Sequence, residues 1–85
     1  MTDRLIIGFF TSSRQEQFLS TIQQSLINQE IDYFETRPDS DFLCQKFGIT
    51  LFPCLIAFKN DRIIRQLFGK YDKDRCINWC NSIVW

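Results

Sequence analysis

Apolar residues fall along the chain in two patterns: short uninterrupted runs, and longer stretches in which they recur every three or four positions. An uninterrupted run bounded by polar residues is typical of a buried strand, and the wider spacing is typical of a helix with one apolar face. The order of these segments predicts β-α-β-α-β-β-α. We therefore expect a single α/β domain over residues 1–85, with a four-stranded mixed sheet flanked by three helices.

The first half of the chain predicts a strand, a helix and a second strand. Residues 5–10 are rich in β-branched and aromatic types, which indicates a central strand buried on both faces. Ser13 and Glu16 fit a capping box, so a helix is expected from Ser13 to near Gln29. Residues 31–35 form the second strand, parallel to the first through a right-handed crossover. The helical stripe expected to face the sheet comprises Phe18, Leu19, Ile22, Leu26 and Ile27.

The second half predicts a short helix, a hairpin and a last helix. The short helix is expected to begin at residue 39 or 40 and to end at residue 47. The apolar run that follows ends at residues 60–61, Asn-Asp, where both residue types tolerate the positive φ of a two-residue hairpin turn. The last helix begins at residues 72–74. Its stripe facing the core comprises Cys76, Trp79, Cys80 and Ile83.

Pro53 opens the first strand of the predicted hairpin. Proline has no N–H to donate to a sheet, so it is tolerated at the first residue of a strand. The main-chain groups of Leu51 and Phe52, just before it, are then available to pair with another segment. This arrangement predicts a contact surface beside Pro53 without identifying the partner.

Charge and length exclude several classes of function. Ten basic residues balance ten acidic ones, and no two basic residues are adjacent, so neither a nucleic acid nor a membrane surface is expected as a partner. The apolar run at residues 5–10 is too short for a secretory leader or a membrane span. We expect a cytoplasmic protein without a cofactor.

Four cysteines allow a disulfide scaffold or a metal site, and their spacing favours neither. They stand at Cys44, Cys54, Cys76 and Cys80, so no two of them are separated by two residues, and the chain has no histidine. A cytoplasmic compartment also keeps thiols reduced. Free thiols are therefore expected, with no metal bound.

From Gly48 to the last helix the sequence resembles thioredoxins. The matching residues are Gly48-Ile49, Pro53 after three further residues, the run of residues 55–61, and Gly69. The resemblance implies the short form of the thioredoxin-like fold, beginning at the strand before the family's active-site helix. It also implies a cis bond between Phe52 and Pro53, because the matching proline of thioredoxins is cis.

The same resemblance places the family's catalytic positions on residues that have no redox chemistry. Counted from the first strand, Arg14 and Gln17 stand where thioredoxins have the two cysteines of C-x-x-C, and Gly8 stands where they have a buried acid. Disulfide exchange needs a thiolate that attacks a sulfur. Dithiol oxidoreductase activity by the family's mechanism is therefore not expected.

Three functions remain open at this point. The first is a binding module that holds a protein or an extended peptide in the groove beside the proline, by pairing with the main chain of Phe52. Its candidate binding residues are Phe10, Ser12, Ser13, Arg14, Leu51, Phe52, Pro53 and Gly69.

The other two functions use sulfur chemistry. In the second, Cys54, which directly follows Pro53, is the reactive thiol of a redox protein with one cysteine. In the third, the chain binds glutathione as glutathione transferases do, with Ser12 or Ser13 beside the thiolate, although residues 68–71 lack the acid and serine that those enzymes use. The sequence leaves the oligomeric state open, a homodimer included.

Overall fold

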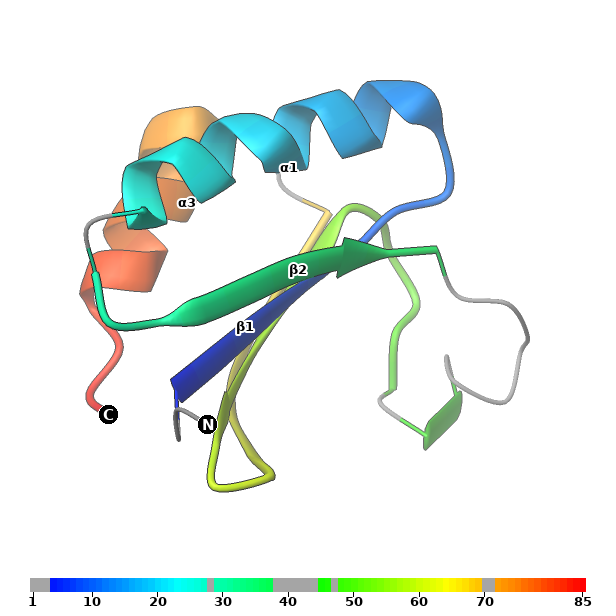
Figure 1. Cartoon of the computed structure of the whole chain (residues 1–85). Helices are drawn as coiled ribbons and strands as arrows, with labels where there is room; N and C mark the ends of the chain where they lie inside the picture. The colour runs from blue at the N-terminus through cyan, green and yellow to red at the C-terminus, as the bar shows by residue number, and fades with distance from the viewer. Residues whose placement is uncertain (1–3, 28, 38–44, 47, 70–71) are drawn as a thin grey trace.

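A computed structural model describes residues 4–27, 29–37, 45–46, 48–69 and 72–85. Strands and helices alternate in the first half and end in a hairpin and a helix, as the sequence predicts (Figure 1). The elements are β1 (Arg4–Phe9), α1 (Ser13–Leu26), β2 (Asp32–Thr36), β3 (Cys54–Lys59), β4 (Arg62–Phe68) and α3 (Lys73–Asn81).

The four strands form one mixed sheet in the order β2-β1-β3-β4. β1 runs parallel to β2 and antiparallel to β3, and β3 runs antiparallel to β4. The central position predicted for the first strand is therefore confirmed. β3 is the other central strand, and every residue in it except Lys59 is buried. β2 and β4 are the edges of the sheet.

The hairpin turn between β3 and β4 has the predicted conformation. Asn60 and Asp61 have φ angles of 51° and 68°, and both residue types adopt this left-handed region more readily than most others. A register shift between Ala57 and Phe58 interrupts the pairing of the two strands. Such irregularities increase the twist of an edge strand such as β4.

α1 and α3 lie side by side over one face of the sheet (Figure 1). The larger apolar cluster fills the space between them and the strands, and it includes Leu19, Ile22 and Leu26 of α1. All four residues predicted for the stripe of the last helix are buried in this cluster. Ile27, expected to face the sheet, is 71% exposed instead, because α1 ends at Leu26 and not near Gln29.

The N-terminus of α1 is capped one residue earlier than predicted. Ser12, and not Ser13, is the cap, and its hydroxyl accepts a hydrogen bond from the Gln15 N–H at 3.3 Å. The Gln15 side chain accepts one from the Thr11 N–H at 2.7 Å. Gln15, and not Glu16, is thus the side chain that folds back over the helix start, and it accepts from the residue before the cap rather than from the cap itself.

A second, smaller apolar cluster lies on the other face of the sheet. It contains Phe9, Ile49, Cys54, Ile56 and Phe58. The short helix expected to end at residue 47 lies mostly outside the described residues, of which Gln45 and Lys46 are helical. The described ranges thus contain two helices that flank the sheet, α1 and α3, where the sequence predicted three.

Candidate functional site

One end of each of the four strands lies at the edge of the sheet where Pro53 precedes β3. The pairing of Phe9 with Cys54 brings the end of β1 beside the start of β3. The Gly69 N–H donates to the Pro53 carbonyl at 2.8 Å, which joins the end of β4. The Phe10 N–H donates to the Thr36 carbonyl at 3.2 Å, which joins the end of β2. We call this end of the sheet the Pro53 surface, formed by Phe10, Arg37, Leu51, Phe52, Pro53 and Gly69.

Leu51 is the exposed apolar side chain of the Pro53 surface. It is 58% exposed, and it lies against Gly69, where a built Cβ atom would approach Leu51 to 3.4 Å. Gly69 has a φ of 65°, which disfavours a side chain there in any case. A glycine at this position therefore leaves Leu51 room to lie across the end of β4.

The backbone before Pro53 is arranged to pair with another segment. The Phe52-Pro53 bond is cis. Within the described residues, the main-chain groups of Leu51 and Phe52 have no hydrogen-bond partner. The Phe52 side chain is half-buried against the second apolar cluster, so Leu51 presents more apolar surface to solvent than Phe52 does.

The loop between β1 and α1 contributes polar groups beside this surface. Ser12, Ser13 and Arg14 are all exposed, and they follow Phe10 directly along the chain. Phe10 itself is buried in the larger cluster, so its ring supports the surface from below. Ser12 also serves as the helix cap described above.

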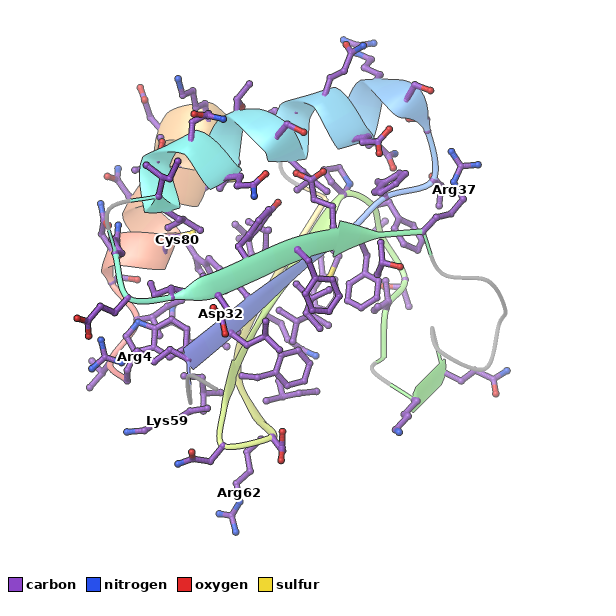
Figure 2. All side chains as sticks on the ribbon, viewed as in Figure 1. Arg4, Asp32, Arg37, Lys59, Arg62 and Cys80 are labelled. Carbon is purple, nitrogen blue, oxygen red and sulfur yellow. The ribbon has the colours of Figure 1, made fainter. Side chains whose placement is uncertain are left out.

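Arg37 is a residue of this surface that the sequence did not indicate. Its guanidinium lies 5.5 Å from the centre of the Phe10 ring, and Figure 2 shows it beside the start of α1. A cation over an aromatic face is held there by the ring's quadrupole. Only the pairing of β1 with β2 brings the two residues together, and a register between distant strands cannot be read from one sequence.

The position that resembles the buried acid of thioredoxins is filled by a tyrosine from the neighbouring strand. A Cβ atom on Gly8 would lie 2.9 Å from the Tyr33 hydroxyl and 3.0 Å from a Leu19 methyl carbon. The Tyr33 hydroxyl lies 3.2 Å from the Leu19 carbonyl oxygen and 3.3 Å from a Glu35 carboxylate oxygen. Burial, together with the Glu35 charge, raises the pKa of this hydroxyl.

The three described thiols are shielded from solvent. Cys54 is 0% exposed, Cys76 1% and Cys80 2%. Burial and the nearby Asp72 raise the pKa of Cys76 to about 11. Burial and the neighbouring Cys76 raise the pKa of Cys80 to about 12. Cys76 and Cys80 are therefore neutral near pH 7, and thiols in this form are poor nucleophiles.

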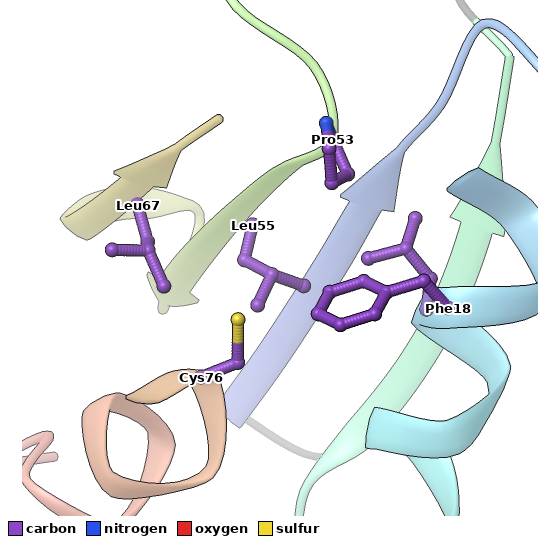
Figure 3. A pocket seen from close by; sticks show the side chains of 6 residues that line it. Phe18, Pro53, Leu55, Leu67 and Cys76 are labelled. Carbon is purple, nitrogen blue, oxygen red and sulfur yellow. The ribbon is translucent and has the colours of Figure 1, made fainter. Parts of the chain in front are cut away.

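A small apolar pocket lies behind Pro53, between the sheet and the two helices. Phe18, Leu55, Leu67 and Cys76 line it, and Figure 3 shows the Cys76 sulfur pointing from α3 toward Leu55. The pocket is too narrow to hold a water molecule. It is therefore a packing defect of the core, and it gives a ligand no route to the Cys76 thiol.

Neither a metal nor a membrane site is formed by the part of the chain that the structure describes. No three side chains of the types that commonly bind metals gather there. No described helix has both the length and the apolar character to cross a bilayer.

Comparison with solved structures identifies the fold. A thioredoxin from Plasmodium falciparum superimposes with a TM-score of 0.80 at 12% identity, over 99% of this chain and 85% of the other. Schistosoma mansoni thioredoxin gives 0.79 at 13%, over 98% and 79% of the two chains. The fold is thioredoxin-like. A mutant thioredoxin of Halobacterium salinarum, at 20% identity, gives 0.69 over 95% and 74%.

The likeness is strong in the fold and weak in the sequence. No family model and no curated protein matches the chain. The fold that the resemblance implied is confirmed, but identities of this size carry no activity with them. Function in this thioredoxin-like domain has to be argued from its own residues.

Proposed function

We propose that this thioredoxin-like domain is a binding module that holds an extended peptide segment at the Pro53 surface and performs no dithiol chemistry. The observation that carries the proposal is Leu51, which remains 58% exposed beside Pro53 and Gly69. A large apolar side chain left in solvent next to unpaired main-chain groups is what a strand-adding peptide uses.

The main chain supplies the second support. Leu51 and Phe52 have no hydrogen-bond partner among the described residues, and an extended peptide laid along them would provide donors and acceptors. The side chain of Leu51 would then contact the apolar residue that the peptide presents on that face. Affinity would come from main-chain pairing, and selectivity from side chains beside it.

The thiols support the absence of dithiol chemistry. The sequence contains no C-x-x-C, and the first turn of α1 presents Arg14. The solved neighbours are thioredoxins, which fit a redox protein acting through Cys54 as well as they fit a binding module. The full burial of Cys54 favours the binding module, because a reactive thiol has to reach its substrate.

The test is peptide selection followed by a matched pair of variants. A display library of random twelve-residue peptides is selected on the folded protein, and the affinity of the best peptide is measured by titration calorimetry. Leu51→Ala removes the exposed anchor and is expected to weaken binding about tenfold, equal to about 1.4 kcal/mol. Ile27→Ala truncates another exposed aliphatic residue, beyond the end of α1, and should leave the affinity unchanged.

Two results would contradict the proposal. A library that yields no binder, or a selected peptide whose affinity does not depend on Leu51, would mean that the Pro53 surface does not hold peptides. Reduction of insulin disulfides by dithiothreitol that is faster with the purified protein than with dithiothreitol alone would mean that a thiol of the protein does react. Circular dichroism of each variant checks that its fold is unchanged.

A further inference from the structure

We infer that the Pro53 surface selects peptides with acidic side chains, and that Arg37 is the main residue that recognises them. This inference presupposes the binding function proposed above and adds the chemistry of the partner. It follows from three observations: how Arg37 is held, what contacts the carboxylate of Glu35, and which charges lie beside the loop between β1 and α1.

Arg37 is held at the surface by its hydrophobic neighbour. Its guanidinium carbon lies over the Phe10 ring, 5.5 Å from the ring centre, and the Phe10 N–H donates to the Thr36 carbonyl at the end of β2. The contact with the ring uses none of the guanidinium N–H groups as donors to a carboxylate, and these groups can bind one with two parallel hydrogen bonds. A group already held in place loses less conformational entropy when it binds.

No described carboxylate neutralises Arg37. The Ser20 hydroxyl oxygen lies 3.2 and 3.3 Å from the two carboxylate oxygens of Glu35, two residues before Arg37. It also lies 3.1 Å from the Glu16 carbonyl oxygen, so its one proton is shared among these acceptors. The Tyr33 hydroxyl lies 3.3 Å from one of the two carboxylate oxygens. These hydroxyls keep the Glu35 carboxylate between β2 and α1. Within the part of the chain that the structure describes, Arg37 thus forms its ring contact and no ion pair.

Arg37 gives this end of the surface a positive charge that no described carboxylate pairs with. Of the described acids nearby, Glu16 lies on the first turn of α1 and Glu35 lies against the two hydroxyls described above. The other half of the surface, around Leu51 and Gly69, is apolar. A complementary peptide therefore has an apolar residue over Leu51 and one or two Asp or Glu residues toward Arg37. A peptide that carries an apolar residue and acidic residues in one chain satisfies both requirements.

The experiment compares each selected peptide with its neutral copy. Peptides from the selection described above are sequenced, and the tightest one is also made with each Asp replaced by Asn and each Glu by Gln. Calorimetry of both peptides at two salt concentrations is done on the parent, Arg37→Gln, Arg37→Lys and Arg62→Gln. Arg62 is exposed at the hairpin turn, away from Arg37 (Figure 2), and provides the matched control.

We expect enrichment of Asp and Glu in the selected peptides. The parent should bind the acidic peptide about threefold to tenfold more tightly than its neutral copy, and added salt should reduce the difference. Arg37→Gln should remove most of this preference without changing the affinity for the neutral copy. Arg37→Lys should keep part of the preference for the acidic peptide, because lysine retains the charge but not the planar fork. Arg62→Gln should behave as the parent.

Other outcomes separate this inference from the proposed function. If the selected peptides are not enriched in acids, or if Arg37→Gln keeps the full preference, the inference is wrong. The binding function stands in that case as long as Leu51→Ala weakens binding. If Leu51→Ala has no effect either, both are wrong, and the peptides bind elsewhere on the protein.

Discussion

Two regions of the molecule differ in which side chains they contain and in how exposed these side chains are. One is the interior beneath α1 and α3, and the other is the Pro53 surface. Beneath the helices lie Cys76, Cys80 and the Tyr33 hydroxyl, groups capable of chemistry, and burial raises the pKa of each. At the Pro53 surface lie Leu51 and Arg37, groups suited to contact, and both are exposed. The reactive groups are thus protected while the contact groups are presented. This distribution supports the proposed binding function.

The largest expected effect concerns the protection of the thiols. In a Cys44→Ser variant only the three described cysteines remain, and they should react with DTNB at pH 8 on the order of 100-fold more slowly in the native protein than in denaturant, because the reaction requires local opening. A stopped-flow trace in each condition measures the ratio. If one equivalent of thiol reacts rapidly with DTNB in the native protein, one of the three thiols, Cys54 in particular, is accessible.

The same thiols give the stability a pH dependence of known sign. The folded-state pKa values of about 11 for Cys76 and about 12 for Cys80 lie above the ordinary 9.0, so the unfolded chain releases these protons first. The free energy of unfolding should therefore fall as pH rises above 9, toward 12. Urea midpoints at pH 8 and at several higher values measure the decrease. If the stability of a double variant with Cys76→Ala and Cys80→Ala falls as steeply with pH, the decrease comes from other groups.

A smaller effect is expected where Tyr33 fills the space beside Gly8. Gly8→Ala places a methyl group 2.9 Å from the Tyr33 hydroxyl and 3.0 Å from Leu19, which should cost about 1–3 kcal/mol of unfolding free energy. Tyr33→Phe removes the hydroxyl, so the alanine should cost less in that background. Urea unfolding of the parent, both single variants and the double variant measures the coupling between the sites. Additive costs would mean that the hydroxyl does not fill this space.

The order of the elements was predictable because it follows from local patterns. The apolar run of β3 and the Asn60-Asp61 turn are each complete within a few residues, and both were predicted from these alone. The cap of α1 was misplaced because Ser12 and Ser13 are equally good caps by residue type. The choice between them depends on the Gln15 side chain bonding to Thr11, which a sequence pattern does not show.

The candidate site was less predictable because most of it comes from contacts between distant strands. The neighbourhood of Pro53 was expected both from the missing N–H of this proline and from the resemblance to thioredoxins. Arg37 was missed because it joins the surface only through the parallel pairing of β1 with β2. Leu51 and Phe52 were both expected at the surface, and only the packing of Phe52 on the second cluster shows that Leu51 is the more exposed.

The central claim, that the Pro53 surface holds an extended peptide, is tested most directly by amide chemical shifts. The 15N-labelled protein is titrated with the tightest selected peptide, and the shift of each amide is followed to saturation. We predict the largest changes at Leu51 and Phe52, because the peptide would pair with their main chain. Smaller changes are expected at Phe10 and Gly69, which belong to the same surface but whose N–H groups already donate within the domain. Small changes at this surface together with large ones along β4 or on the outer faces of α1 and α3 would contradict the claim.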